Sequence, residues 1–444
     1  MIKNEKNNDS PVSWASLKVV LLSLNWYRRK DPRIPLGMAY IYSEIKNRFQ
    51  GLGFKEVSFI EADVRDNLSN VIHEILTVNP LVLGIGVYAW NSEQTRKIVN
   101  SLRKLGFSGK IVLGGPEITY GGNELNEEFT GIQYFVKGFG EKAFADILES
   151  LIHKSDYLIK GVYKHGSEIG NILAEASMDL NSSPFLQEEL LDKISGKDFI
   201  RWQTQRGCVF ICSFCAFKLP NGGIAESDME TVKLELLKLK EMGIKNVAVL
   251  DPVFFLFKKR SLRILKIIEA MTPKVRFNIQ TRFEHLDSEI IIRLSRLNIV
   301  LECGLQTLDP KVQRKIKRIN NKEKVIAAMY ALKDSHVKFE THLIYGLPEQ
   351  TFESFLSDLL FLYDMGCQTV RIFPLSRLKG TEIDVEKESN GIVFSPVFPN
   401  EVIKSDWMTI EEVFVLKRIQ RMLEDNENVF SESILKPIES IRVN

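Results

Sequence analysis

Three cysteines stand close together in the segment Arg206-Gly-Cys208-Val-Phe-Ile-Cys212-Ser-Phe-Cys215. A 4Fe-4S cluster that only transfers electrons takes four thiolates, so a compact trio without a fourth cysteine nearby leaves one iron open to bind another molecule. The spacing lets one tight loop direct three sulfurs at a single point, and Gly207 permits the turn that leads into it. Zinc is the competing interpretation. It requires a fourth Cys or His, and the nearest histidines, His165 and His285, are far away in sequence.

The segment Gln205-Arg-Gly-Cys208-x-x-x-Cys212-x-Phe214-Cys215 resembles the cluster loop of the radical S-adenosylmethionine (SAM) enzymes. The resemblance implies that the amino and carboxylate groups of SAM bind the open iron. An electron from a donor such as flavodoxin or ferredoxin then cleaves SAM to a 5'-deoxyadenosyl radical, which abstracts a substrate hydrogen. It also implies that Phe214 and Phe217 pack around the cluster and the adenine, although both could equally be core residues. In such an enzyme the protein positions the substrate and excludes water.

Composition restricts the compartment and the partners of the chain. Its 444 residues suggest two or three domains, and a net charge of +2, from 59 basic and 57 acidic residues, gives no case for nucleic acid or membrane as a partner. Five cysteines, three of them in one loop, fit a reducing compartment. The polar N-terminus has no apolar segment of signal-peptide length, and no run is long enough for a membrane span. We expect a cytoplasmic, oxygen-sensitive protein.

Residues 17–154, after a flexible tail over residues 1–16, alternate between short apolar runs and amphipathic stretches. The run Leu17–Leu24 is typical of a buried parallel strand, and the pattern repeats along the domain. It predicts a Rossmann-like, doubly wound parallel sheet, in which ligands bind beyond the carboxyl ends of the strands. Polar and glycine residues fall at those ends: Asn25, Asp63, Tyr88–Asn91, Gly114–Glu117 and Gly138–Glu141.

This first domain resembles the cobalamin-binding domain that precedes the radical core in a large subgroup of the family. The matching pieces are Pro35-Leu-Gly37, Gly86-Val-Tyr88-Ala-Trp90-Asn91, Gly114-Gly115-Pro116 and Gly138-Phe-Gly140-Glu141. The axial-histidine motif Asp-x-His-x-x-Gly is absent, as it often is in the family's cobalamin enzymes. Phe139 and the run Trp26-Tyr27-Arg28-Arg29 are large residues where a corrin ring would need room. Cobalamin binding and a role as scaffold or peptide-docking surface therefore both stay open.

Residues 155–198 have the composition of a linker, and residues 199–383 again repeat strand and helix. Six strands are expected there: Ile200–Thr204, Asn246–Leu250, Val275–Ile279, Ile299–Glu302, Phe339–Ile344 and Val370–Phe373. Six such repeats suggest the partial (β/α)6 barrel of the radical SAM enzymes, with chemistry at the carboxyl ends of its strands. Residues 384–444 are expected to form a small helical C-terminal cap.

Polar residues stand at the expected strand ends of this barrel: Asp251, Gln280, Arg282, Glu302, Gln306, Tyr345 and Gly346. An arginine there can hold the carboxylate of SAM with two parallel hydrogen bonds, a Glu or Gln can accept the ribose hydroxyls, and glycine lets the backbone approach adenine. The resemblance supports these roles, since Glu302-Cys-Gly-Leu-Gln306-Thr and Ile344-Tyr-Gly-Leu-Pro-Glu349 are similar to family segments around the cofactor. The alternative for each is a solvated residue at a loop tip.

Two reactions share this architecture. One is epimerisation of residues in a ribosomally made precursor peptide, as in the proteusin-type epimerases, where a thiol returns the hydrogen; Cys303 and Cys367 are the candidates. If Glu302 points into the barrel, Cys303 points outward, and Cys367 precedes the sixth strand, so a structural role is as plausible for each. The other reaction is cobalamin-dependent methylation of an unactivated carbon. A non-catalytic cluster scaffold or redox sensor would lack the polar strand ends present here.

Overall fold

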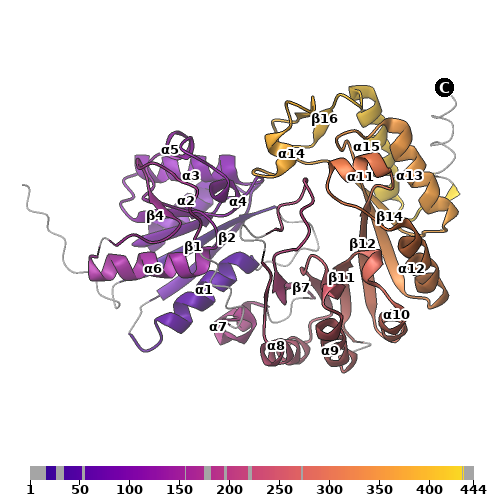
Figure 1. Ribbon diagram of the computed structural model, residues 1–444. Coiled ribbons are helices and arrows are strands. Elements are labelled where there is room, and N and C mark those ends of the chain that lie inside the picture. Colours follow the sequence, from indigo (N-terminus) through magenta and orange to yellow (C-terminus); the bar gives the residue numbers. More distant parts are fainter. Residues whose placement is uncertain are drawn as a thin grey trace, which may run out of the picture. The chain divides into compact units, whose positions relative to one another are not determined.

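The computed structural model describes residues 17–26, 35–52, 56–155, 157–174, 182–194, 198–218, 223–271, 274–432 and 434. The chain divides into two compact units, Met1–Lys193 and Ile194–Asn444, shown in Figure 1. The expected tail over residues 1–16, Tyr27–Arg29 and Asn181 lie outside the described residues.

The first unit contains a six-stranded sheet in the order β2-β1-β3-β4-β5-β6. Its strands are β1 (Lys18–Asn25), β2 (Glu56–Asp63), β3 (Val82–Gly86), β4 (Lys110–Gly114), β5 (Tyr134–Val136) and β6 (Val162–Lys164). Neighbours pair in parallel, except that β6 runs antiparallel to β5. Part of the expected linker, residues 162–164, thus forms an edge strand of this sheet. By pairing with β5, it satisfies backbone groups that would otherwise be left at an open edge.

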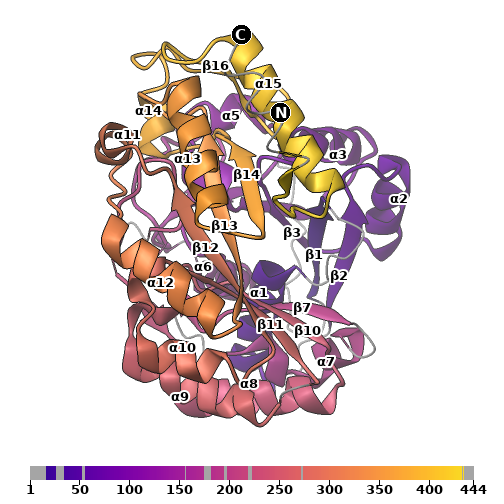
Figure 2. The same ribbon diagram turned by 90° about the vertical axis from the view of Figure 1, so that its right-hand side faces the viewer.

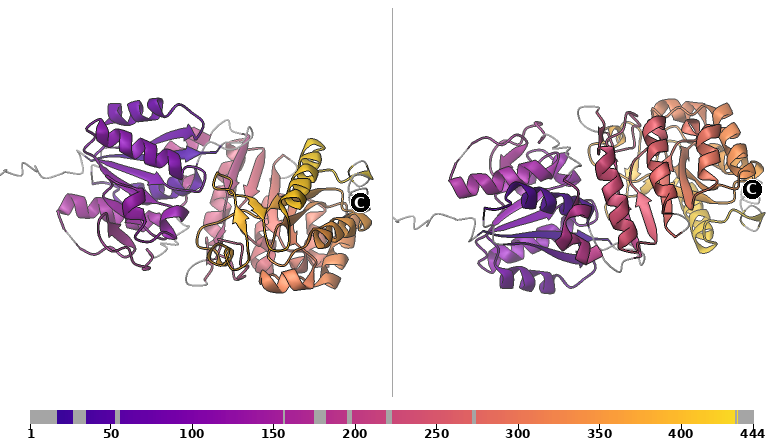
Figure 3. Two further views of the ribbon diagram at one scale, coloured as in Figure 1. Left: turned by 90° about the horizontal axis from the view of Figure 1, so that it is seen from above. Right: turned by 90° about the horizontal axis from the view of Figure 1, so that it is seen from below.

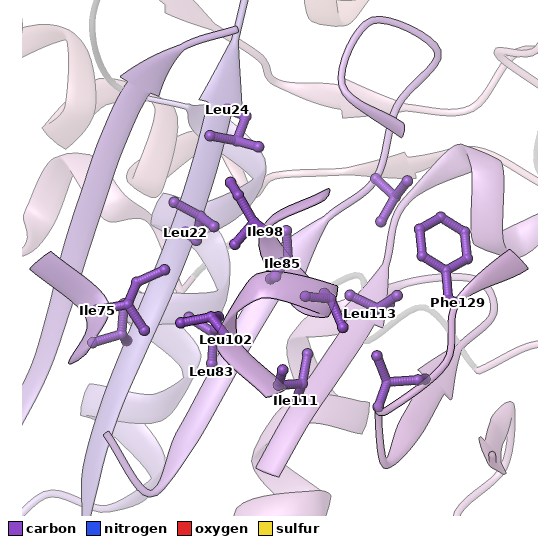
Figure 4. Close-up of a cluster of buried hydrophobic side chains, with 14 of the residues drawn as sticks. Leu22, Leu24, Ile75, Leu83, Ile85, Ile98, Leu102, Ile111, Leu113 and Phe129 are labelled. Atoms are coloured by element: carbon purple, nitrogen blue, oxygen red, sulfur yellow. The ribbon is translucent and has the colours of Figure 1, made fainter. Parts of the chain in front are cut away.

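Helices cover both faces of this sheet, as Figure 3 shows. On one face lie α2 (Leu68–Val78), α3 (Ser92–Lys104), α4 (Pro116–Thr119) and α5 (Leu125–Glu128), and on the other lie α1 (Leu36–Arg48) and α6 (Gly140–His153). Alternate residues of β1 enter the two cores: Leu22 packs with Ile98 and Leu102 (Figure 4), while Leu21 packs with the α1 and α6 side. Burial on both faces explains why β1 is a continuous apolar run.

The second unit contains a six-stranded parallel sheet in the order β14-β13-β12-β11-β10-β7. Its strands are β7 (Phe199–Trp202), β10 (Asn246–Val249), β11 (Arg276–Thr281), β12 (Ile299–Gln306), β13 (Lys338–Tyr345) and β14 (Val370–Pro374). They overlap the six predicted strands. The outer face is covered by α8 (Met229–Glu241), α9 (Lys258–Glu269), α10 (Ser288–Leu294), α12 (Lys322–Asp334) and α13 (Phe352–Asp364), as Figure 2 shows. This confirms the predicted α/β fold with two parallel sheets.

The C-terminal segment contains α14 (Glu382–Val385), the hairpin of β15 (Val393–Phe394) and β16 (Val402–Lys404), and α15 (Ile410–Asp425). The hairpin lies at the carboxyl end of the sheet, where the Val402 amide donates to Leu375. Helix α15 packs beside β14 (Figure 2), and its Gln420 accepts the Tyr345 hydroxyl at 2.9 Å.

Candidate active site

The cysteine loop begins after β8 (Gln205–Arg206), which pairs with β9 (Ala225–Glu226). Gly207 has φ +87°, a conformation that glycine adopts without strain, so it makes the expected turn. The Ser213 amide donates to the carbonyl of Ile316 at 3.0 Å, and the Ser213 carbonyl accepts from Ile383 at 3.1 Å. The loop is therefore fixed from two directions by segments that follow β12 and β14.

The three sulfurs influence one another. Cys212 is buried and Cys208 and Cys215 are half-buried. Burial raises the pKa of Cys208 and of Cys215, and the neighbouring Cys212 sulfur raises both further, whereas the Arg318 guanidinium acts in the opposite direction. Such thiols lose their protons when iron binds, because thiolate is the form that ligates a metal. Among the described residues, no three His, Cys, Asp or Glu side chains converge around a position for a single metal ion.

Two arginines lie beside this loop. Arg282 follows β11, its guanidinium stands 4.3 Å from the centre of the Phe210 ring, and it donates to the carbonyl of Ile319. Arg318 donates to the carbonyl of Gly304 and interacts with the Cys212 sulfur; burial lowers the pKa of Arg318, as does the nearby Arg282.

Both guanidinium groups are almost fully buried, and the structure gives the Nε of Arg282 and of Arg318 no partner among the described residues. Arg282 also forms an ion pair with Glu284 at 3.2 Å, so one carboxylate is shared between two buried cations, and the carboxylate of SAM would supply a second anion for the unpaired Nε donors.

Asp251 has a different role from the one predicted. Its carboxylate is buried and accepts hydrogen bonds from the Thr204 amide at 2.7 Å, the Thr204 hydroxyl at 2.5 Å and the Gln205 amide at 3.1 Å. Burial raises its pKa to about 6, although these bonds act against the shift. Asp251 therefore holds the segment between β7 and the cysteine loop, and its carboxylate oxygens are occupied by these bonds.

Side chains alternate along the strands of this sheet, and one set of positions is only half-buried. Gln280 and Glu302 stand opposite each other on β11 and β12, and Glu302 accepts from Asn278 at 3.4 Å. Gln306 ends β12 at a β-bulge with φ +71°. The inner face of the sheet is the face opposite its packed helices. These residues lie on that face, which is where residues that contact the cofactor are expected. On the cysteine loop, Phe214 is half-buried and Phe217 is 53% exposed.

The remaining predicted residues lie on the helix-covered side. Tyr345 is fully buried and packs against Phe355, so its ring does not reach the inner face; Gly346, with φ +82°, makes the turn that follows. Cys303 and Cys367 are also buried, and Cys367 lies 3.2 Å from the Thr341 hydroxyl. The Cys303 thiol has a strongly raised pKa because of burial. Their position does not support a hydrogen-donor role, since a donor must face the substrate.

Sequence reasoning missed two features. Arg318 lies in a loop, away from any strand end, so only the folded path of residues 316–320 brings it to the sulfurs. The second feature is the set Glu340, His342 and Arg371 on the inner face of β13 and β14. Its sequence signal was two ionisable residues, Glu340 and His342, spaced two positions apart in the strand Phe339-Glu-Thr-His-Leu-Ile344.

In the first unit, the predicted strand ends form one edge of the sheet. The Asn91 side chain is buried; it donates to the carbonyls of Leu24 and Gly86 at 3.0 and 2.9 Å and accepts from the Tyr88 amide at 2.8 Å. Asn91 therefore joins the ends of β1 and β3. Tyr88 stacks on Trp90 with ring centres 4.4 Å apart. Partly exposed glycines follow along the same edge: Gly114, Gly115, Gly138 and Gly140.

Comparisons with known proteins identify both units. Residues 202–362 match the family model of the radical SAM superfamily, and residues 32–148 match the model of the B12 binding domain. The first match contains the cysteine loop and most of the second sheet, and the second contains the glycine-rich edge of the first sheet. The chain therefore joins a B12 binding domain to a radical SAM domain. The cofactors that go with a radical SAM domain are a 4Fe-4S cluster and SAM.

Two similar proteins are named methyltransferases, and the name of one of them includes cobalamin and radical SAM. The chain is 24% identical over 412 residues to 2-(S-pantetheinyl)-carbapenam-3-carboxylate methyltransferase of Streptantibioticus cattleyicolor, covering 86% of this chain and 58% of that protein. It is 22% identical to the cobalamin-dependent radical SAM methyltransferase TokK of Streptomyces tokunonensis, covering 84% of this chain and 57% of that protein. The chain thus spans less than two thirds of the length of these two relatives.

Among solved structures, the chain resembles the cobalamin-dependent SAM radical enzyme OxsB with aqua-cobalamin and SAM bound. The TM-score is 0.71 at 14% identity, covering 96% of this chain and 70% of that one, which shows a shared fold. In the part of the chain that the structure describes, no helix is both long and apolar enough to cross a membrane.

Proposed function

We propose that this protein is a cobalamin-dependent radical SAM methyltransferase that methylates a carbon atom of its substrate. The observation that carries the proposal is the presence of a B12 binding domain and a radical SAM domain in one chain. Two relatives that cover most of this chain are named methyltransferases, one of them cobalamin-dependent.

The residues of the second unit fit the cluster and SAM. Cys208, Cys212 and Cys215 would ligate three irons, and the buried guanidiniums of Arg282 and Arg318 would hold the carboxylate of SAM. When bound, the cluster and SAM supply a radical that takes a hydrogen atom from an unactivated carbon, and methylcobalamin supplies the methyl group. A flavodoxin or ferredoxin would provide the electron. The protein's own part is to hold SAM and substrate on the inner face and to exclude water.

The strand-end edge of the first unit would hold cobalamin. The strand-end edge carries partly exposed glycines at Gly114, Gly115, Gly138 and Gly140, and the lack of side chains there would let a broad, flat molecule approach the ends of β4 and β5. No histidine directly follows any of the described parallel strands β1 to β5 of this unit. Phe139, a large residue where a corrin ring would need room, directly precedes α6 at this edge, so its side chain would have to lie beside a bound ring.

The epimerase hypothesis loses its main support. The comparisons associate the chain with methyltransferases, and both candidate donor thiols are buried on the helix-covered side of the sheet. A precursor peptide is accordingly one candidate substrate among others.

The test is cofactor retention followed by methyl transfer. The protein is purified without oxygen, its cluster is reconstituted with hydroxocobalamin present, and the desalted sample is examined for corrin absorption. We expect about one cobalamin per chain, and labelled methyl from SAM on that cobalamin. A desalted protein without corrin bands, despite a complete cluster, would refute the methyltransferase proposal.

A further inference from the structure

Three charged or polar side chains form a connected group on the inner face of the second sheet. Glu340 accepts a hydrogen bond from Arg371 Nε at 2.9 Å, and its other oxygen lies 2.9 Å from His342 Nε2. The Glu340 carboxylate is buried, whereas 41% of the Arg371 side chain is exposed. Burial by itself would raise the pKa of Glu340, but the bonds from His342 and Arg371 outweigh it and lower the pKa. Glu340 therefore acts as an ionised support for its two neighbours.

The bonds to Glu340 leave other polar atoms of Arg371 and His342 without a hydrogen-bond partner among the described residues. The Nη groups of Arg371 and the Nδ1 of His342 have no hydrogen-bond partner among the described residues. With Nε bound to Glu340, the two Nη groups form an end-on fork that matches the two oxygens of a carboxylate. Because Nε2 of His342 faces a carboxylate, Nδ1 is the atom left to accept a proton or a hydrogen bond.

An aromatic ring stands beside this group. Phe373 is 39% exposed although it lies in a strand, on the same face as Arg371 two residues earlier. Its ring contacts His342 edge-on, with centres 5.3 Å apart. The inner face here thus offers an apolar surface next to a cationic fork, which is a combination that binds a molecule with both an apolar body and an acidic group.

The strand register places this group near the cluster loop. Gly304, His342 and Arg371 are paired across β12, β13 and β14, and Arg318, which contacts the Cys212 sulfur, donates to the carbonyl of Gly304. Adjacent strands are about 4.8 Å apart, so the Arg371 backbone lies about 10 Å along the sheet from Gly304, whose carbonyl accepts from the cluster-side Arg318. That separation suits a substrate bound next to SAM.

We propose that Arg371 and His342, held by Glu340, form the substrate subsite of this enzyme and that the substrate carries a carboxylate. Arg371 binds the carboxylate end-on, His342 Nδ1 accepts a hydrogen bond from a neighbouring N–H or O–H group, and Phe373 contacts the apolar part. The inference rests on the proposed function, because it assigns the substrate of that reaction, and it identifies Arg371 and His342 as positioning residues.

The experiment uses phenylacetate as probe, since it joins a carboxylate to one ring. Equilibrium dialysis with labelled phenylacetate is carried out on the anaerobic holoprotein, with phenylacetamide and phenyl phosphate as competitors. We expect saturable binding that phenylacetamide does not displace. Arg371→Gln should weaken binding at least about tenfold and Arg371→Lys less, because lysine keeps the charge without the fork. Arg293→Gln, which removes an ion-paired arginine on the outer helix α10, should leave binding unchanged.

Absence of saturable binding to the native protein, or binding that survives Arg371→Gln in a protein with an intact cluster spectrum, would overturn the proposal. Displacement by phenyl phosphate at concentrations far below those of phenylacetate would replace the carboxylate assignment with a phosphate. Cobalamin retention and SAM cleavage are measured on the same native sample. If the native protein neither retains cobalamin nor cleaves SAM, the methyltransferase function is refuted. The binding of phenylacetate is measured separately and still tests the carboxylate site.

Discussion

At the scale of single residues, the site consists of thiols and buried guanidinium groups whose arrangement requires a bound ligand. Cys208, Cys212 and Cys215 form no disulfide, and Arg282 and Arg318 are buried cations whose Nε atoms have no partner among the described residues. Buried polar groups without partners mark places where a ligand completes the structure.

Replacement of a cluster cysteine should remove the cluster. In Cys212→Ala, only two thiolates remain, so we expect less than about a tenth of the native iron and sulfide content and no SAM cleavage. Iron analysis and visible absorption measure the result. Cys367→Ala removes a buried thiol from the helix-covered side and should keep the full cluster. Native iron content in Cys212→Ala would refute the assignment of the loop.

Arg318 should contribute to SAM binding. Loss of a charge-assisted hydrogen bond from Arg318→Gln should raise the Kd for SAM by about 10- to 100-fold, which corresponds to about 1.5–3 kcal/mol. Equilibrium dialysis with labelled SAM on reconstituted protein measures this. Arg314→Gln changes an exposed arginine four residues earlier and serves as the matched control. Equal weakening in both variants would indicate a general charge effect and contradict the specific role of Arg318.

At the scale of elements, strand positions were predictable and the orientation of their residues was not. The strands of the second sheet carry apolar residues in short runs or at every second position, and many of these residues are buried against the helices. Which face a strand-end residue points to depends on register and on the β-bulge at Gln306. Tyr345 therefore looked like a cofactor contact although it packs against Phe355, and Asp251 looked like one although it anchors the start of the cysteine loop.

Arg318 shows a further limit of sequence reasoning. It reaches Cys212 because the loop after α11 (Pro310–Lys315) is bonded to Ser213 of the cysteine loop. This contact joins residues about a hundred positions apart, so no local sequence pattern predicts it. Glu340 and His342, in contrast, can be recognised in the sequence as ionisable residues within an expected strand. Placing them in the site requires only the assumption that the polar face of that strand lines the barrel.

Asp358 links α13 to the end of β12 and should make this link sensitive to pH. It accepts from the Thr307 hydroxyl at 2.7 Å and the Leu308 amide at 3.0 Å, and burial raises its pKa from 3.8 to about 7. The folded state thus binds the proton more tightly than the unfolded state. This contribution to stability is complete below about pH 4 and is lost as pH rises to about 7.

In Asp358→Asn this pH dependence should disappear. Hydrogen exchange of residues 352–364, corrected for the intrinsic effect of pH, should show opening that becomes easier between pH 5.5 and 8 in the native protein, by at most about 3 kcal/mol. The variant should show no such change. Asp364→Asn, at the exposed end of the same helix, should behave as the native protein does. Identical profiles for Asp358→Asn and the native protein would show that Asp358 does not titrate in this range.

At the scale of the whole molecule, each unit has a sheet and a core of its own. The two core clusters of the first unit consist of residues between Leu17 and Leu190, and its strand-end edge is stabilised internally by Asn91. The cysteine loop is fixed by Ser213 bonds within the second unit. Folding of the first unit therefore does not require the cluster.

It follows that cobalamin and the cluster should load independently. A variant in which Cys208, Cys212 and Cys215 are all replaced by Ala should retain cobalamin within about twofold of the native amount after desalting, because the glycine-rich edge of the first unit is unchanged. It should release no 5'-deoxyadenosine from SAM. Corrin absorption and chromatography measure the two outcomes separately. If cobalamin is lost together with the cluster while the protein stays folded, residues beyond Lys193 must hold it, and the first unit alone is not the cobalamin site.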